Sequence, residues 1–418
     1  MSSEHTSLIT NMGTTVGILM VVLMLIFYTS SLQTPFWKKF YTFIPSILLC
    51  YFLPSVLNTL GIISDSDGSL YFFTSRYLLP TTLVLLTLSV DFKEIMKLGK
   101  KAVIMFLAGT TGIVLGGPIA ILIMSAISPE TVGGVGPEAV WRGMATVAGS
   151  WIGGSANQAA MFEVFGASGQ LFSSMIAVDV IVANIWMAFL LYGAGASQKV
   201  DKWLKADAST IEEVKTRVED YRSSIAKIPT LTDTMVILGI GFGVMGLAHF
   251  LADFIAPWIE YHAPGLEKFS LTKQFFWLVV IATAIGLALS FTPAKKYEGA
   301  GASRLGSVLI YVLIASIGLH MDIKAIFDNP GLFLVGGIWM LVHVTILLSV
   351  AKIIKAPFFF VAVGSQANVG GAASAPVVAS AFHPSLAPVG VLLAVMGYVL
   401  GTYGAYLCGL MMQAASNL

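Results

Sequence analysis

Twelve long apolar runs constrain the fold of this chain more than any other feature of its sequence. A helix needs about 20 residues to cross a bilayer, and many of these runs reach or exceed that length. Of the 418 residues only 11% are charged, whereas a soluble domain carries roughly 25%. The sequence therefore predicts an all-α polytopic membrane protein. The runs fall near residues 12–31, 41–63, 70–90, 102–127, 140–165, 170–196, 230–259, 271–292, 302–320, 331–354, 356–382 and 386–415.

One hydrophilic stretch divides the chain almost in half. Residues 197–229 are rich in both signs of charge and predict a helical cytoplasmic linker. We therefore expect a first transmembrane half at residues 1–196 and a second at residues 230–418. Residues 1–10 contain no lysine or arginine, which favours a first helix that is retained over a cleaved signal peptide.

The two halves resemble one another in short motifs. Asp91 begins an Asp-x-Lys-x-Ile run after the third apolar segment, and Asp322 begins the same pattern after the ninth. Asn157 in the fifth segment matches Asn368 in the eleventh. Two matches in the same order on equivalent segments indicate a duplication, and we expect Asp91 and Asp322 to be interfacial charges.

Basic residues mark cytoplasmic loops and conflict with twelve simple crossings. Twelve crossings would put the linker outside, although its seven basic residues favour the inside. An odd correction, to eleven or thirteen crossings, would remove the conflict. It would also place the two halves in opposite orientations as inverted repeats. The sequence does not identify the miscounted segment.

Two polar, glycine-rich interruptions lie inside apolar segments, one in each half. A broken helix exposes unpaired backbone groups, which persist at bilayer depth only where they are buried in protein or line a watery cavity. Paired breaks of this kind indicate the ion or substrate site of a secondary transporter. Close packing by small residues is the alternative. The expected site residues are Gly154, Ser155, Asn157 and Gln158 in the first break and Ser365, Gln366, Asn368 and Gly370 in the second.

Asp179 lies in the middle of an apolar segment, where a carboxylate costs at least about 2.5 kcal/mol to insert. It is predicted to bind a cation or a proton, and a structural acid bonded to a neighbouring helix is the alternative. Glu163, Asn184 and His343 are secondary candidates. For His343 a packing role is favoured, and Arg142 is expected to snorkel toward the interface.

Several function classes find no support in these residues. The net charge of +1 gives no field for nucleic acid, and the two cysteines lie in apolar segments. There is no metalloprotease, serine hydrolase or phosphate-loop motif. No catalytic activity is expected, and no cofactor apart from Na⁺ as a coupling ion near Asp179, Asn157 and Gln366.

At these same residues the chain resembles a prokaryotic membrane family called domain of unknown function 819. The residues that carry the resemblance are Leu78–Pro80 through Asp91, the Gly-Ser-x-x-Gly-Gly-Ser-Ala-Asn run from Gly149, and Gly364–Gly371. That family is similar to the bile-acid/sodium symporters, sodium/glutamate symporters and cation/proton antiporters. The resemblance implies inverted repeats of five or six helices whose broken helices cross near midmembrane, and a core that moves against a scaffold as an elevator. It also implies ion binding at Asp179, as in the antiporters, or at Ser155, Asn157, Gln158 and Gln366, as in the bile-acid branch.

The resulting hypothesis is a Na⁺- or H⁺-coupled secondary transporter of a small polar or anionic metabolite. It would have about 11–13 transmembrane helices in two inverted repeats with two broken crossing helices. A cation/proton antiporter without organic substrate is the alternative, and a membrane enzyme or scaffold is a third class. Expected partners are the bilayer, a small-molecule solute and, as an open alternative, a second copy of the chain. A bacterial inner membrane is the favoured location.

Overall fold

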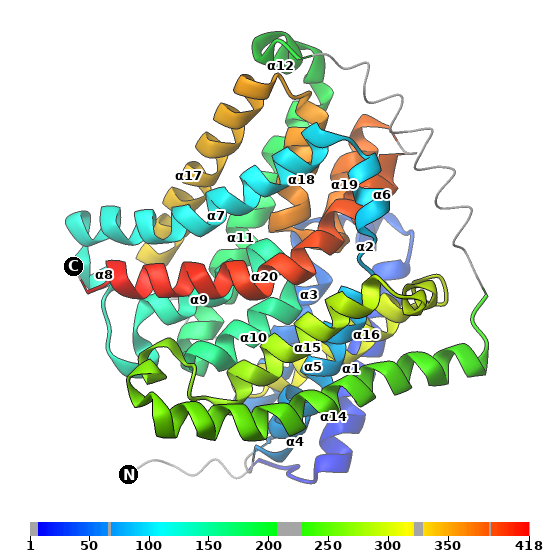
Figure 1. The fold of residues 1–418 in the computed structure, drawn as a ribbon, viewed down its shortest axis with the longest axis vertical. Helices are drawn as coiled ribbons and strands as arrows, with labels where there is room; N and C mark the ends of the chain where they lie inside the picture. The colour runs from blue at the N-terminus through cyan, green and yellow to red at the C-terminus, as the bar shows by residue number, and fades with distance from the viewer. Residues whose placement is uncertain (1–6, 66–67, 207–227, 322–328, 384–385, 418) are drawn as a thin grey trace.

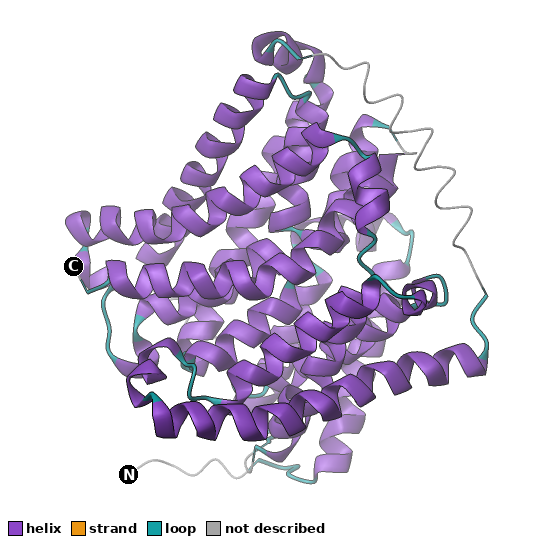
Figure 2. Ribbon diagram, viewed as in Figure 1, coloured by secondary structure: helices purple, strands orange, loops and turns teal. Residues whose placement is uncertain are grey.

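The computed structural model describes residues 7–65, 68–206, 228–321, 329–383 and 386–417, and these are helical and irregular without a β-strand (Figures 1 and 2). Most of the linker at 197–229 and the Asp322 motif lie outside the described residues. The α-helices are α1 (Met12–Ser31), α2 (Pro35–Phe43), α3 (Ser46–Thr59), α4 (Ser69–Phe73), α5 (Leu79–Leu88), α6 (Phe92–Lys97), α7 (Lys100–Ile127), α8 (Pro129–Val132), α9 (Val140–Gly153), α10 (Ser155–Phe165), α11 (Gly169–Gly195), α12 (Ser197–Leu204), α14 (Leu231–His262), α15 (Gln274–Ser290), α16 (Ala302–Gly318), α17 (Gly331–Ile354), α18 (Phe358–Val369), α19 (Gly371–Phe382) and α20 (Ala387–Ala415).

Each of the twelve predicted apolar segments contains a helix or a broken pair of helices. Six helices are long and apolar enough to cross a membrane, namely α1, α7, α11, α14, α17 and α20. The π-helical turn η1 (Thr74–Leu78) joins α4 to α5 in one uninterrupted helical stretch, which together with α3, α15 and α16 supplies shorter apolar elements. The prediction of a polytopic all-α membrane protein is confirmed.

The two broken segments are hairpins that turn back rather than crossing helices. In the first hairpin, α9 and α10, Arg142 near the start of α9 donates a hydrogen bond to the carbonyl of Phe165 at the end of α10. In the second, α18 and α19, the rings of Phe359 and Phe382 lie 5.3 Å apart. Each hairpin therefore begins and ends on the same side. The expected broken helices are present, but they are re-entrant.

Re-entrance removes the conflict between loop charge and helix count. Outside the two hairpins, the described residues contain ten helical elements of 14 residues or more, five in each half, when α4, η1 and α5 are counted as one stretch. We take these ten as the crossings, of which six are long and apolar enough to cross a membrane by themselves. The number of crossings is below the expected 11–13, because a glycine-broken apolar segment of about 25 residues has the same hydropathy whether it crosses or returns. An odd number of crossings per half gives the two halves opposite orientations.

Close contacts confirm that equivalent helices run in opposite directions. On α7 and α17, Gly112 abuts the backbone of His343, and Gly116, four residues later, abuts Trp339, four residues earlier. The α5 stretch and α16 are antiparallel as well. Thr74 bonds to Ser316 at 2.6 Å, and Thr82 donates to the carbonyl of Gly306 at 3.3 Å.

The two hairpins are also inverted relative to each other. Helix α18 runs parallel to α7, because the Lys101 ammonium bonds to the carbonyl of Lys355 just before α18 and Thr110 bonds to Asn368 near its end. Helix α20 also runs parallel to α7, with Cys408 near Ile113 and Met412 near Gly117. Helix α9 runs antiparallel to α20, since Gly153 meets Gly397 and Ala145 meets Gly409. It follows that α9 and α18 point in opposite directions.

Basic residues gather at one side of this arrangement, where α7, α14 and α18 begin. The positive-inside rule identifies that side as cytoplasmic. The opposite side carries Asp65, Glu130, Glu138, Glu260 and Glu267 with fewer basic residues. In Figure 1 the cytoplasmic side lies to the right, and the C-terminus lies on the left. The basic residues on the cytoplasmic side are Lys38, Lys39, Lys93, Lys97, Lys100, Lys101, Lys199, Lys202, Lys205, Lys295, Lys296, Arg304, Lys352 and Lys355.

The helices pack into two bundles. Helices α1, α3, α5, α14, α15 and α16 pack mainly against one another, and we call them the scaffold bundle. The hairpins pack with α7, α11, α17 and α20, and we call these the core bundle. Helix α12 joins the core bundle, since Asp201 accepts a hydrogen bond from the N–H of Phe358 at the start of α18 at 2.7 Å.

Candidate functional site

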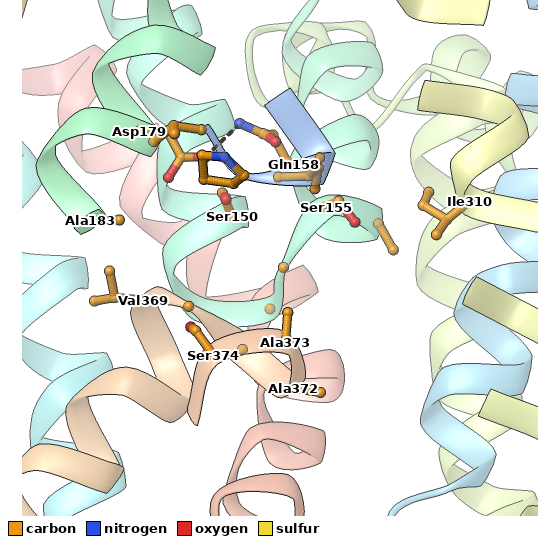
Figure 3. A pocket seen from close by; sticks show the side chains of 18 of the residues that line it. Ser150, Ser155, Gln158, Asp179, Ala183, Ile310, Val369, Ala372, Ala373 and Ser374 are labelled. Carbon is orange, nitrogen blue, oxygen red and sulfur yellow. Dashed lines mark hydrogen bonds between the residues drawn. The ribbon is translucent and has the colours of Figure 1, made fainter. Parts of the chain in front are cut away.

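A cavity of about 430 Å³ lies where the two hairpin tips face the scaffold bundle (Figure 3). The core bundle supplies the tips, α11 and Tyr398, and the scaffold supplies α3, α16 and Leu86. Among the described residues of the cavity wall, Asp179 is the only aspartate, glutamate, lysine or arginine. The scaffold residues are Pro45, Ser46, Ile47 and Tyr51 in or just before the cytoplasmic half of α3, Leu86 near the cytoplasmic end of α5, and Ser307, Ile310 and Tyr311 toward the middle of α16.

Glycines shape both tips. Gly154 has φ +75° and Gly371 has φ +57°, in the region that side chains rarely adopt. A Cβ on Gly370 would lie only 1.8 Å from the Ser374 hydroxyl oxygen and 2.2 Å from the Gln366 amide nitrogen. No side chain caps the N-terminus of α10 or α19. Two positive helix ends therefore face one cavity, whose wall includes the predicted Gly154, Ser155 and Gly370.

Asp179 is buried in the cavity wall and accepts hydrogen bonds from the first hairpin. The Trp151 indole N–H donates to one carboxylate oxygen at 2.7 Å, and the Gln158 amide donates to the other at 3.0 Å. Figure 3 shows Asp179 and Gln158 across the cavity from Ser374. Both donors come from the first hairpin, which links the acid directly to the first tip. The carboxyl group has hydrogen-bond donors but no cationic side chain beside it in the described wall.

Two polar atoms of the wall have no hydrogen-bond partner within the described part of the protein. Gln366 donates from its amide nitrogen to Ser374 at 2.7 Å, while its Oε1 is unpartnered. The Tyr51 hydroxyl is also unpartnered, and the residue is 1% exposed. Buried polar atoms nearly always have a partner in protein or water. These two atoms are therefore available to a bound species.

Asn157 and Asn368 lie outside the cavity wall, each saturated with hydrogen bonds. The amide nitrogen of Asn157 donates to the carbonyls of Gly153 and Tyr398, and its oxygen accepts from Thr402 at 2.6 Å. Asn368 makes the corresponding set with Gly364, Phe106 and Thr110. Both asparagines fasten a hairpin to a neighbouring helix, and Asn157 is not placed near the expected Na⁺ ligands.

The sequence match between these two asparagines does not correspond to equivalent positions. Asn157 follows its break, on the second helix of its hairpin, whereas Asn368 precedes its break, on the first helix. They also fasten non-equivalent helices, α20 and α7. The duplication is supported by helix direction rather than by this pair.

Ser365 and His343 form a buried chain within the core bundle. The Trp186 indole donates to the Ser365 oxygen at 2.8 Å, and Ser365 lies 2.7 Å from Nε2 of His343. Nδ1 of His343 lies 3.0 Å from the carbonyl of Gly109. Because only a protonated nitrogen can donate to that carbonyl, Nδ1 carries a proton, and both ring nitrogens have partners within the core bundle. The predicted packing role of His343 agrees with this geometry, and Ser365 lies away from the cavity wall.

Of the other candidates, Asn184 lies at the cavity, whereas Glu163 and Arg142 lie toward the side opposite the cytoplasm. Asn184 lines the cavity, and its amide donates to the carbonyl of Val180 at 2.8 Å. Glu163 lies outside the wall and pairs with Arg76 at 2.7 Å. Arg142 sits at the base of the first hairpin over the Trp141 ring.

The described residues contain no cluster of three or more histidine, cysteine or acidic side chains that would hold a transition metal. Oxygen atoms around the cavity are of the kind that alkali cations prefer. They include Asp179, Gln366 Oε1 and the Ser150 and Ser155 hydroxyls. The residues present therefore fit a Na⁺ ion beside Asp179, without Asn157.

Sequence reasoning missed Tyr51 and Trp151. Tyr51 lies in an apolar segment with no break, so nothing in its neighbourhood sets it apart. Trp151 lies two residues before the first glycine pair and shares its break. This position could have identified Trp151 as a donor to a buried polar group, because a buried indole N–H needs an acceptor.

Comparison with known proteins agrees with this architecture. Residues 17–415 match the family model described as "Protein of unknown function (DUF819)". The chain is also 23% identical over 360 residues to the "Uncharacterized membrane protein YjcL" of Bacillus subtilis (strain 168), covering 83% of this chain and 85% of that protein. Because the match extends over nearly all of both bundles, the chain belongs to the DUF819 membrane protein family.

Proposed function

We propose that this protein is a secondary active transporter, coupled to Na⁺ or H⁺, that carries a small polar or anionic solute by alternating access. The observation that carries the proposal is the meeting of two inverted re-entrant tips at one cavity between two bundles. Paired broken segments at a repeat interface are the usual construction of a transporter site.

Asp179 supports ion coupling. A carboxylate at bilayer depth without a cationic side chain in the described cavity wall is costly to move through a low-dielectric barrier. Binding of Na⁺ or a proton would neutralise it and permit movement of the core bundle. The uncapped ends of α10 and α19 would favour a negative or polar group on the solute.

Closure on one side supports alternating access. Most scaffold residues of the cavity wall lie in the cytoplasmic halves of α3 and α5, and Ile310 and Tyr311 lie at the middle of α16. On the opposite side the first hairpin contacts the scaffold through Glu163 and Arg76, and Ser270 donates to the carbonyl of Val164 at 3.1 Å. This geometry fits a cytoplasm-facing state, and an elevator movement of the core bundle would expose the tips to the other side. The proposed location is a bacterial inner membrane.

Reconstitution of the purified chain into proteoliposomes tests the proposal. An imposed Na⁺ or H⁺ gradient should drive uptake of a solute from a pool of labelled amino acids, hydroxy acids and dicarboxylates. Asp179→Asn should remove the gradient dependence, whereas Asp91→Asn, a matched change at the cytoplasmic surface, should retain it. Absence of flux under every gradient would contradict the proposal.

A cation/proton antiporter is the second candidate, favoured because Asp179 is the only aspartate, glutamate, lysine or arginine of the described wall. It predicts Na⁺- or K⁺-dependent proton release from liposomes without any organic solute. Asp179→Asn should abolish that release. Solute uptake that depends on the gradient separates the symporter from this alternative.

A further inference from the structure

Tyr51 and Gln366 approach the cavity from different bundles. Tyr51 lies on α3 of the scaffold, and Gln366 lies on α18 of the core. Both line the cavity, both are at least 98% buried, and each holds one polar atom without a partner in the described part of the protein. Tyr51 is also within electrostatic range of the Asp179 carboxylate. The three side chains therefore present oxygen atoms to one space.

The chemistry of these atoms restricts what can satisfy them. The oxygen of a glutamine amide is an acceptor, and an ionised carboxylate is an acceptor only. The nitrogen of the Gln366 amide already donates to Ser374. A partner for Oε1 must consequently bring a hydrogen-bond donor or a cation. Apolar side chains dominate the rest of this part of the wall, including Ile47, Ile176, Ile310 and Val369.

We propose that the transported solute carries a hydroxyl, amino or amide N–H or O–H group beside a small apolar body, and that this donor binds Gln366 Oε1 and the Tyr51 hydroxyl. The proposal rests on the transport function proposed above and names its substrate class. Because the two residues belong to different bundles, the solute bridges scaffold and core in the cytoplasm-facing state. Tyr51 and Gln366 then set specificity, while Asp179 serves the coupling ion.

Matched solutes test the donor requirement in the purified full chain. The probes are lactate and alanine against propionate, and glycolate and glycine against acetate, each with Na⁺ at constant pH. A hydrogen bond to a buried acceptor is worth about tenfold in affinity. We expect half-maximal thermal stabilisation at concentrations about tenfold lower for the donor-bearing member of at least one pair. Gln366→Leu should reduce that preference to about twofold or less.

A conservative pair of variants separates binding from folding. Tyr51→Phe and Tyr71→Phe both remove a buried hydroxyl that has no partner in the described residues, but Tyr71 lies outside the cavity wall. Neither change should lower the melting temperature of the ligand-free protein by more than about 1 °C. Only Tyr51→Phe should weaken the donor preference.

Three results would overturn the donor assignment. One is equal stabilisation by the donor-bearing and donor-lacking members of all four pairs, in which lactate or alanine is compared with propionate and glycolate or glycine with acetate. Another is a preference that survives in Gln366→Leu. The third is stabilisation by Na⁺ alone with no response to any of the six probes. In each case ion-driven flux in proteoliposomes would still support the transport proposal, whereas its absence would contradict transport itself.

Discussion

At the scale of single residues, Asn157 and Asn368 were predicted to be ligands. In the structure each one instead holds a hairpin against a neighbouring helix through hydrogen bonds. Asn157→Ala and Asn368→Ala each remove three hydrogen bonds of a buried side chain, two to carbonyls and one from a threonine hydroxyl. We expect a loss of about 2–4 kcal/mol in each case, because unpaired buried groups are costly. Thermal unfolding in detergent measures it.

Asn184→Ala is the matched control for this pair, because Asn184 is only partly buried and its amide bonds within its own helix. Its effect on stability should stay within about 0.5 kcal/mol. If Asn157→Ala kept its stability but lost all thermal stabilisation by Na⁺, Asn157 would be an ion ligand after all.

Residue types alone did not separate these roles. Asn157 and Gln158 are adjacent in the sequence, yet one turns toward α20 and the other toward Asp179. Adjacent residues on a helix point about 100° apart. One break can therefore supply both Asn157, which bonds to a neighbouring helix, and Gln158, which lines the cavity. The position of Asp179 followed from its apolar neighbours, because an acid at that depth needs a polar surrounding.

At the scale of elements, the glycine pairs predicted where the helices break. The return of each hairpin was not predictable, because α9 and α10 together have the length of one crossing, and the contacts that reveal the return join residues far apart, such as Arg142 and Phe165. Hydropathy measures length and polarity, whereas the direction after a break depends on tertiary packing.

The two turns should differ in what they tolerate. Gly154 has φ +75° and ψ −172°, a conformation that is essentially restricted to glycine. Gly371 has φ +57°, in the left-handed region that asparagine also visits. We expect Gly154→Asn to cost about 1–3 kcal/mol and to abolish transport, and Gly371→Asn to cost under about 1 kcal/mol. Melting temperatures compare them, and equal losses would contradict the conformational argument, since a Cβ has open space at both positions.

Helix α12 should make stability pH-dependent through Asp201. Burial raises the pKa of Asp201, although its hydrogen bond from the Phe358 N–H lowers it. An acid whose folded pKa lies above its unfolded value contributes less stability as pH rises through that interval, which starts near pH 4. Asp201→Asn keeps an acceptor for α18 and should flatten this decline. Asp201→Ala should instead lose about 1 kcal/mol at neutral pH as well. The free energy of unfolding, measured from pH 4 to 7, distinguishes these outcomes. If it rises with pH in the wild type while it stays flat in Asp201→Asn, the pKa of Asp201 is lowered by folding and the prediction is wrong.

At the scale of the whole molecule, the distribution of basic residues among the loops indicated that a count of twelve simple crossings was wrong. Basic residues on the loops assigned to the inside indicated one miscounted segment and eleven or thirteen crossings, whereas the structure has two re-entrant hairpins and five crossings in each half, an odd number that inverts one half relative to the other. The cavity depends on this inversion, because only opposed halves bring two hairpin tips from opposite sides to one depth.

Under the proposed transport function, the ion pair between Glu163 and Arg76 would have a role in the movement of the core. The pair joins the first hairpin to η1 of the scaffold on the side opposite the cytoplasm, and Arg76 also lies 4.3 Å from the Phe275 ring centroid. Glu163→Gln should weaken closure by about 1–3 kcal/mol, and each 1.4 kcal/mol is a tenfold change in population. The protein should then expose its cavity to the outer side more often.

Ser155→Cys provides a reporter for that exposure, because Ser155 lines the cavity while the native Cys50 and Cys408 are fully buried. A membrane-impermeant maleimide should label it from the cytoplasmic side in the otherwise unchanged protein. Added Glu163→Gln should raise labelling from the opposite side about tenfold. Glu94→Gln, which breaks the cytoplasmic pair with Lys97, serves as the control and should leave sidedness unchanged. If Glu163→Gln leaves sidedness unchanged too, the pair stabilises the hairpin without controlling access, and closure must depend on apolar contacts such as that between Tyr71 and Phe162.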